Sequence, residues 1–390
     1  MMIRRLLPTL ALVALVSPAH ADFSSCVAGL KADAAKQGVS SATLSAAFNG
    51  LDPDMKVLEF ENYQPEFKTP IWDYMAALVD DERVADGKKA MAEHAAALRL
   101  AESKFGVDRH VIAAFWGVES NFGESMGDRP LVRSLATLAC EPSRRPAFYR
   151  GELMATLKIA DSGDVPLDEL KGSWAGAFGQ TQFMPSTFLR LAVDLDGSGR
   201  DIVSNAAAAL GSTGNYMKKA GWRTGMPWGF EVSLPDGYSG PSGRKDKHPM
   251  SYWSGKGIRR LDGGSLGDAD AGLLLPAGAN GPAFLVTRNF DAIYSYNPPS
   301  ISYALAVAIL SQRLAGGPDI QTPWPTDDPG LSRAQRRQMQ ELLTKAGYDV
   351  GAPDGAIGAK TKSAIADFQG KHGLPVDGRP SKKVLDALQR

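Results

Sequence analysis

The sequence predicts a mainly α-helical protein of the α+β class, with a small β-containing insertion and a separate helical unit in its last part. Ala-rich amphipathic stretches at 28–48 and 86–105 have the apolar spacing of helices. Between 222 and 296, Gly and Pro become dense and β-prone runs appear, which indicates short strands. The Pro/Gly/Asp-rich segment 316–330 is typical of a linker and separates residues 331–390 from the rest.

Helices are predicted along most of the chain, with two short strands between them. Residues 22–110 are expected to be helical, with breaks at Asp52-Pro53 and Thr69-Pro70. Helices separated by glycine-rich loops continue through 111–220, and Tyr303 to Leu314 is expected to be a buried helix. The predicted strands cover residues 230–232 and 283–287. The predicted C-terminal helices cover residues 331–346, 360–369 and 381–388.

Composition and charge limit the classes of function open to this chain. Its 390 residues are enough for two domains, and 44% hydrophobic with 22% charged residues is ordinary for a globular protein. Lys plus Arg and Asp plus Glu both total 43, so the formal net charge is zero. This balance argues against a nucleic acid partner and against an anionic membrane surface. The sequence also has no Walker A loop, no dinucleotide-binding fingerprint and no His-based metal motif.

Residues 1–21 have the features of a secretory signal peptide. Arg4 and Arg5 form a charged start, residues 6–16 are apolar, and the Ala-His-Ala at 19–21 fits cleavage after a small residue. The alternative is an uncleaved N-terminal anchor, but the apolar stretch is short for a membrane span. We therefore predict export to the periplasm and no membrane span in the mature chain.

Export changes the interpretation of the two cysteines, Cys26 and Cys140. In an oxidising compartment an even pair favours a disulfide. The alternative is two separate buried thiols, and two isolated cysteines would make a poor metal site.

One carboxylate stands at the end of a strongly apolar run. Residues 111–118 are almost all hydrophobic, and Glu119 follows them directly. The Asn-Phe-Gly sequence at 121–123 predicts that the helix ends just after this residue. A carboxyl in partly desolvated surroundings has a raised pKa and can donate a proton at neutral pH. The alternatives are a Glu on a polar face or in a buried ion pair.

A second informative segment is rich in small residues. Residues 172–188 read GSWAGAFGQTQFMPSTF, and the small side chains allow close approach of the backbone to another element or to a ligand. Trp174, Gln180 and Gln182 could stack on a sugar ring and bond its hydroxyls. The alternative is a tightly packed turn in which the glycines serve packing only.

Taken together, these two segments resemble the lysozyme-like lytic murein transglycosylases, and more narrowly the lytic murein transglycosylase B family. Further matches are PSRRPAFYRGEL at 142–153, DLDGSGRDIVSNAAAALGSTGNYMKKAGW at 194–222 and YNPPSISYALAV at 296–307. The resemblance covers most of residues 23–315. Residues 346–378 resemble the three-helix peptidoglycan-binding module that follows many cell-wall enzymes.

The resemblance implies a role for particular residues. Glu119 would be the catalytic acid and base. The residues that match family positions in contact with the glycan are Ser173, Gln182, Arg144, Arg145, Tyr296, Asn297 and Tyr303. The implied reaction cleaves the bond between muramic acid and glucosamine without water and leaves a 1,6-anhydromuramyl end. The rival hypotheses are a hydrolytic muramidase, which needs a second carboxylate, and a non-catalytic cell-wall binding protein.

Residues 194–205 partly fit a calcium-binding loop. The oxygen-bearing candidates, at positions 1, 3, 5 and 12 of such a loop, are Asp194, Asp196, Ser198 and Asn205. Family members can bind calcium here, but a neutral residue at position 12 predicts weak affinity. The alternative is a plain Asp/Gly turn, and no cofactor is expected to be required.

The predicted organisation is thus a signal peptide at 1–21, a lysozyme-like domain at 22–315, a linker at 316–330 and a peptidoglycan-binding domain at 331–390. The expected partner is the glycan strand of peptidoglycan, and the sequence singles out no protein partner. Because the linker is rich in Pro, Gly and Asp, we expect few contacts between the two units. On that expectation, deletion of 331–390 would spare cleavage of short glycans.

Overall fold

The computed structural model describes residues 18–62 and 69–390. Most of the predicted signal peptide, residues 1–17, lies outside the described residues. Within the described part, the fold is mainly helical with a small sheet, as the sequence predicted. None of the helices described there combines the length and the apolar character that a membrane crossing requires.

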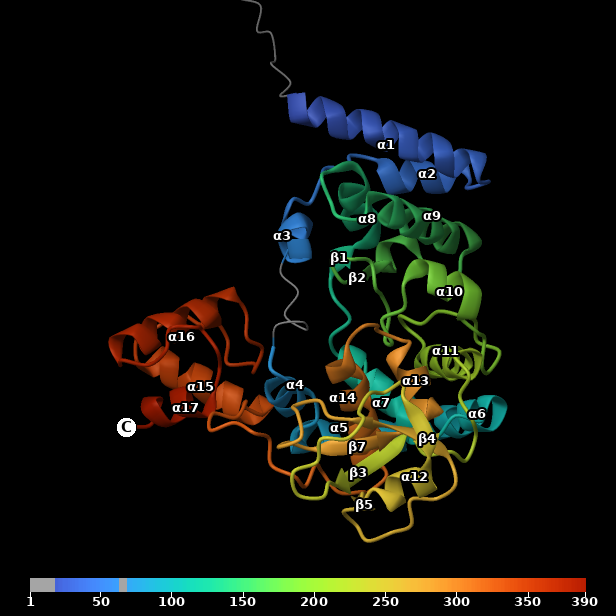
Figure 1. Ribbon diagram of the computed structural model, residues 1–390. Helices are drawn as coiled ribbons and strands as arrows, with labels where there is room; N and C mark the ends of the chain where they lie inside the picture. Colours follow the sequence, from blue (N-terminus) through green and yellow to red (C-terminus); the bar gives the residue numbers. More distant parts are fainter. Residues whose placement is uncertain (1–17, 63–68) are drawn as a thin grey trace, which may run out of the picture.

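A first group of helices forms the upper lobe in Figure 1 and has its own core. Its helices are α1 (Pro18–Lys36), α2 (Ser41–Phe48), α3 (Lys56–Asn62), α8 (Leu131–Cys140), α9 (Pro146–Ser162) and α10 (Pro185–Leu191). A disulfide between Cys26 and Cys140 links α1 to the end of α8, with 5.8 Å between the two Cα atoms. The predicted pairing of the cysteines is thereby confirmed.

A second group of helices forms the lower body in Figure 1 and includes α7, the helix that carries Glu119. Its helices are α4 (Ile71–Leu78), α5 (Asp81–Glu93), α6 (Ala95–Phe105), α7 (Arg109–Ser120), α11 (Ala206–Lys219), α13 (Arg288–Tyr294) and α14 (Ile301–Leu314). Helix α7 runs through the centre of this core, where its apolar side chains pack against α14. This packing explains why the sequence of α7 is hydrophobic on nearly all sides.

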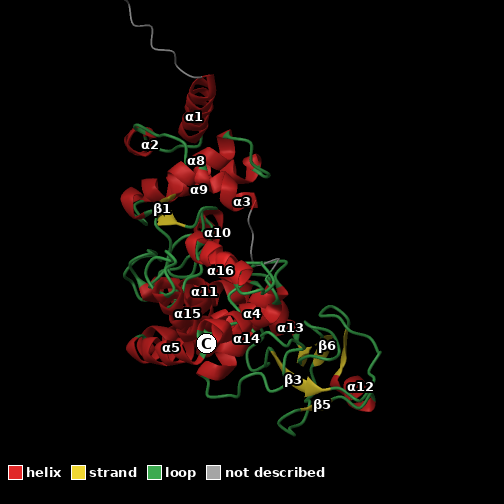
Figure 2. Ribbon diagram, turned by 90° about the vertical axis from the view of Figure 1, so that its left-hand side faces the viewer, coloured by secondary structure: helices red, strands yellow, loops and turns green. Residues whose placement is uncertain are grey.

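The predicted β-containing insertion is an antiparallel sheet with strand order β4-β6-β7-β3-β5. Its strands are β3 (Gly229–Ser233), β4 (Lys247–Pro249), β5 (Arg259–Arg260), β6 (Asp270–Leu274) and β7 (Ala283–Val286), with the short helix α12 (Met250–Gly255). Figure 2 shows these strands gathered to one side of α13 and α14. A two-stranded ladder, β1 (Arg129–Pro130) with β2 (Lys171–Gly172), and a 3-10 turn at Leu167–Glu169 complete the body.

The C-terminal unit contains the three helices that the sequence predicted. They are α15 (Arg333–Lys345), α16 (Ala359–Lys371) and α17 (Lys382–Leu388), and they share a small apolar core that includes Phe368. In Figure 1 these helices, orange to red, lie beside α4 and α5.

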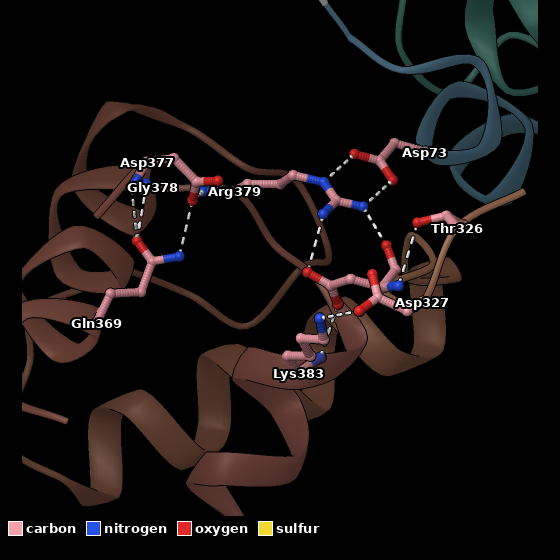
Figure 3. Close-up of polar contacts among 9 residues, drawn as sticks. Asp73, Thr326, Asp327, Gln369, Asp377, Gly378, Arg379 and Lys383 are labelled. Carbon is pink, nitrogen blue, oxygen red and sulfur yellow. Dashed lines mark hydrogen bonds and ion pairs between the residues drawn. The ribbon is translucent and has the colours of Figure 1, made fainter. Parts of the chain in front are cut away.

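The expectation of few contacts between the two units is wrong. Arg379 donates to both oxygens of the Asp73 carboxylate on α4, at 2.5 and 2.7 Å, and to Asp328 at 2.9 Å (Figure 3). Arg333 and Arg337 on α15 both pair with Glu82 on α5. The composition of the linker describes only the local chain, whereas this contact depends on charges that folding brings together from distant helices.

Candidate active site

Glu119 lies one residue before the end of α7. The helix begins after Asp108, whose carboxylate accepts a hydrogen bond from the backbone N–H of His110 at 2.7 Å and caps the helix. Residues 111–117 are buried, and the helix ends at Ser120, after which Asn121 has a left-handed backbone with φ of 51°. The carboxylate therefore lies where a buried helix stops, as the sequence predicted.

Burial changes the acidity of Glu119. The side chain is only partly exposed, and burial raises the pKa of its carboxyl from 4.5 to about 8. The hydroxyl of Tyr303 donates a hydrogen bond to Glu119 Oε1, which lowers that pKa and offsets part of the effect. Because burial has the larger effect, the carboxyl carries a proton near neutral pH, as a general acid must.

Tyr303 is the direct partner of the catalytic candidate. It lies on α14 with only 2% of its surface exposed. Burial, together with the nearby charge of Glu119, keeps the pKa of its hydroxyl well above the ordinary value, so the hydroxyl stays protonated and remains a donor. The resemblance to the transglycosylase family implied that Tyr303 contacts the glycan. The structure adds a bond to Glu119 that orients the carboxyl.

A cluster of aromatic rings connects α7 to the glycine-rich loop, which is the segment 172–188. The ring of Tyr296 lies 4.5 Å from that of Phe115 and 6.4 Å from that of Tyr303, measured between centroids. Its hydroxyl donates to the carbonyl oxygen of Thr181 at 2.6 Å. Tyr296 therefore lies beside the site, as predicted. Its neighbour Asn297 is exposed, in a turn closed by a bond from the Ser300 N–H to the Asn297 carbonyl at 3.1 Å.

Ser120 ties the end of α7 to the same loop, a link that the sequence did not reveal. Its hydroxyl donates to the carbonyl oxygen of Gln180 at 2.5 Å and accepts the backbone N–H of Gly123 at 2.8 Å. The side chain of Gln180 is itself buried and donates to the carbonyl of Val203 at 3.1 Å. Gln180 therefore supports the loop, and its amide nitrogen is engaged within the protein.

Ser173 and Gln182 both lie in this loop and are partly exposed. The Ser173 hydroxyl accepts the backbone N–H of Ala177 at 3.0 Å. The amide nitrogen of Gln182 donates to the carbonyls of Met126 and Gly179, each at 2.9 Å. Each of the two predicted glycan contacts thus also holds the shape of the loop, and Gln182 links it to the turn that follows α7.

Two glycines, Gly172 in the segment 172–188 and Gly127 in the turn after α7, show why small residues are needed where these two parts of the chain meet. A Cβ on Gly127 would lie 2.4 Å from the backbone carbonyl carbon of Gly172, and a Cβ on Gly172 would lie 2.1 Å from the carbonyl oxygen of Ala177. Any side chain at these positions would collide with backbone. At these positions the small residues serve close packing of chain segments, which was the alternative considered from the sequence.

Arg144 and Arg145 lie at the turn between α8 and α9 and are exposed. The backbone N–H of Arg144 donates to the buried carboxylate of Glu61 at 2.9 Å. The guanidinium of Arg145 lies 3.9 Å from the centroid of the Phe148 ring. These contacts place both arginines on the surface of the upper lobe, where a role in glycan binding remains a prediction.

Other acidic side chains near Glu119 in sequence do not share its environment. Glu124 and Asp128 are both exposed, in the turn after α7, and Glu124 accepts a hydrogen bond from the amide of Asn121. Neither carboxyl is desolvated by burial. Between residues 109 and 128, all of which are described, Glu119 is therefore the one carboxyl with the environment of a general acid.

Arg83 on α5 also supports the site, although no pattern in the sequence marks it. Its side chain is buried and donates to the carbonyl oxygen of Gly117, two residues before Glu119. Burial lowers the pKa of its guanidinium to about 10, so it remains charged at neutral pH. A cation at this end of α7 satisfies a carbonyl and opposes the negative end of the helix dipole.

The four candidate calcium ligands lie in one loop. Asn205 donates to the Ser198 hydroxyl at 2.6 Å, and that hydroxyl bonds Asp196. The side-chain oxygen Oδ1 of Asn205 accepts the backbone N–H of Ala207 at 2.9 Å and caps α11. In the described part of the chain, no group of three or more His, Cys, Asp or Glu side chains could hold a metal ion. Two of the four candidates, Asp194 and Asp196, carry a carboxylate, and calcium binding at this loop remains a prediction.

Comparisons with known proteins match both parts of the chain to described families. A family model described as a transglycosylase SLT domain matches residues 22–312, and one described as a putative peptidoglycan binding domain matches 332–388. The chain is similar to membrane-bound lytic murein transglycosylase B of Escherichia coli (strain K12), with 34% identity over 250 residues. That alignment covers 62% of this chain and 66% of the relative, slightly less than two thirds of its length.

Two solved structures are also similar. SltB3 from Pseudomonas aeruginosa, in complex with NAG-anhNAM-pentapeptide, is 44% identical with a TM-score of 0.75, and the match covers 95% of this chain and 100% of that one. Lytic transglycosylase Slt35 from Escherichia coli, in complex with calcium, is 29% identical with a TM-score of 0.66, covering 77% and 98%. The chain therefore belongs to the SLT-domain family of lytic murein transglycosylases and carries a peptidoglycan binding domain after that domain.

Proposed function

We propose that this protein is a peptidoglycan lytic transglycosylase that uses Glu119 first as an acid and then as a base. The observation that carries the proposal is the partly buried carboxyl at the end of α7, whose pKa burial raises to about 8 and which accepts a hydrogen bond from Tyr303. The similarity to SltB3, which was solved with an anhydromuramyl ligand, supports the same reaction.

The proposed reaction needs only one carboxyl group. The protonated carboxyl of Glu119 donates its proton to the oxygen between muramic acid and glucosamine, and the bond from that oxygen to muramyl C1 breaks. The carboxylate then removes the proton from the muramyl C6 hydroxyl, whose oxygen bonds to C1. Glu119 regains its proton, water is not consumed, and the product ends in 1,6-anhydromuramic acid. Attack from within the same sugar gains from proximity.

Tyr303 would act on the carboxyl and not on the sugar in this scheme. Its hydroxyl stabilises the carboxylate that forms after proton donation, while burial favours the acid form that starts the cycle. The two opposing influences keep the pKa of Glu119 near the working pH, which suits a group that must donate and then accept a proton.

Analysis of the released products tests this proposal against hydrolysis. We expect muropeptides released from purified sacculi to carry anhydro ends, one water lighter than the hydrolytic product, as measured by mass spectrometry. A hydrolytic muramidase needs a second carboxylate to position water, and it would release reducing muramic acid ends instead. A cell-wall binding protein without activity would release neither product.

The activity should fall as the pH rises through about 8. The acid form of Glu119 is required, and burial places its pKa at about 8. Initial rates at low substrate concentration should therefore have an upper limb that bends near this pH. A limb that bends near 4.5, the ordinary value for Glu, would contradict the desolvated carboxyl.

We also propose weak calcium binding at residues 194–205, without a part in the chemistry. Slt35, a relative at 29% identity, was solved with calcium. Calcium at ten times its dissociation constant would stabilise the fold by about 1.4 kcal/mol, so melting curves at millimolar calcium should shift upward. Asp196→Asn should abolish the shift, and an equal shift in that variant would show that calcium acts elsewhere.

The proposed substrate and module place the enzyme outside the cytoplasm, and the predicted signal peptide at 1–21 makes the periplasm the proposed compartment. The C-terminal domain would bind peptidoglycan and raise the local concentration of the active site at the wall. Ser173, Gln182, Arg144, Arg145, Asn297 and Tyr296 are the proposed glycan contacts.

A further inference from the structure

Arg333 is the first residue of α15, in the peptidoglycan binding domain, and its side chain is only 15% exposed. Its Nε donates to Glu82 at 3.0 Å, one Nη bonds Asp86, and the other donates to the side-chain oxygen of Asn121 at 3.2 Å. The guanidinium therefore bridges α5 and the end of α7 within one rigid, planar group.

Asn121 is the cap residue directly after α7, the helix that carries Glu119. It follows the last residue of α7 in the left-handed conformation, which glycine and asparagine adopt more readily than other residues. Its backbone N–H donates to Gly117 at 3.1 Å, and its amide nitrogen bonds Glu124. The side-chain oxygen faces Arg333. Arg333 thus contacts the cap of the catalytic helix, two residues beyond the carboxyl.

Helix α5 gives this contact a fixed support. Asp80 caps α5 by accepting the N–H of Arg83 at 2.8 Å, and it also accepts the backbone N–H of Arg333 at 2.7 Å. Arg83, from the same helix, donates to the Gly117 carbonyl of α7. The start of α15, the start of α5 and the end of α7 therefore form one hydrogen-bonded unit.

We propose that Arg333 of the peptidoglycan binding domain is a positioning residue for Glu119, acting through Asn121. The proposal rests on the proposed transglycosylase function. A general acid must lie within hydrogen-bond reach of the glycosidic oxygen, and a misplacement of about 1 Å can cost about 10²-fold in rate. The C-terminal domain thereby completes the catalytic domain in addition to binding the wall.

The other two arginines of the interface provide matched controls. Arg337 lies one turn further along α15 and donates to the same carboxylate, Glu82, at 2.6 Å. Arg379 joins the domains through Asp73 on α4. Both hold the domain in place, and neither bonds Asn121. If Arg333→Ala lowered kcat only because the C-terminal domain docks less tightly, Arg337→Ala or Arg379→Ala should lower kcat to the same extent.

The experiment measures kcat and KM of the full-length variants on a short soluble glycan that does not need the wall. We expect Arg333→Ala to lower kcat by about ten-fold, the order of one lost hydrogen bond to a charged group, with KM within two-fold of wild type. Arg337→Ala and Arg379→Ala should keep both parameters within two-fold. Melting temperatures of all variants check that each is folded.

A double-mutant cycle shows whether the effect passes through Asn121. Asn121→Gly keeps the left-handed turn accessible and removes the side-chain oxygen. If Arg333 acts through this oxygen, the double variant should have nearly the kcat of Arg333→Ala alone, whereas independent effects would multiply.

Three results would overturn the inference: an unchanged kcat in Arg333→Ala, an equal loss in all three arginine variants, or multiplying losses in the cycle. Failure of the proposed function is a separate result, because it would appear in the wild-type protein as reducing ends or no turnover.

Discussion

Glu119→Gln should abolish turnover while leaving the fold intact. Gln has nearly the same shape and can still accept the hydrogen bond from Tyr303, but it has no proton to deliver to the glycosidic oxygen. Loss of a general acid lowers rates by about 10²–10⁴-fold, and here the same group also serves as the base. The measurement is the rate of release of anhydromuropeptides from sacculi.

Stability measurements provide the control for this variant. Burial raises the pKa of Glu119 from 4.5 to about 8, so between these pH values the folded protein binds a proton that the unfolded chain does not. The stability of wild type must then fall as the pH rises through this range. Glu119→Gln lacks this effect, so its melting temperature should exceed that of wild type by a margin that grows up to about pH 8. Near-normal turnover, or a margin independent of pH, would contradict the assignment.

Among the proposed changes, removal of the disulfide between Cys26 and Cys140 should cause the largest decrease in the free energy of unfolding. Cys26 and Cys140 are separated by 114 positions, and closing a loop of this order restricts the unfolded chain by about 4–5 kcal/mol in the entropic account. We expect the double variant Cys26→Ser, Cys140→Ser to have a free energy of unfolding lower by several kcal/mol, measured by urea denaturation of the oxidised proteins.

The control for this prediction is wild type unfolded in the presence of a thiol reductant, which should match the double variant. Because the bond links α1 to α8 in the core of the upper lobe, whereas α7 and α14 belong to the core of the lower body, the folded variant should still cleave short glycans. Equal unfolding free energies for wild type and variant under oxidising conditions would show that the disulfide does not stabilise the fold.

Much of the fold was predictable because its signals are local. The apolar run before Glu119 predicted a buried helix, and the Asn-Phe-Gly sequence predicted where it ends, at Ser120. The density of Gly and Pro between 222 and 296 predicted the β insertion, and the periodicity after 331 predicted three helices. Each of these depends on the preferences and spacing of residues that are neighbours in the chain.

The supporting contacts of the site were not predictable in the same way. Arg144 and Arg145 were chosen by resemblance, and no local signal in the sequence predicts the bond from the Arg144 backbone N–H to Glu61 or the packing of Arg145 on Phe148. Gln180 was one candidate for a bond to a sugar hydroxyl, with a packed turn as the alternative, and its amide nitrogen donates to the carbonyl of Val203. A polar side chain has several possible partners, and its sequence neighbours do not decide between them.

The amino-acid sequence was enough to predict the helical class, the carboxyl at the end of a buried helix and the pairing of the two cysteines, because these follow from composition, periodicity and local preferences. The three-dimensional fold sets the partners of the side chains: Tyr303 bonds Glu119 across 184 positions, and Arg333 bonds Asn121 across 212. It also decided that the C-terminal domain docks on α4 and α5 instead of standing apart. Such pairings depend on which surfaces meet when the hydrophobic core forms, and a local pattern carries no information about that.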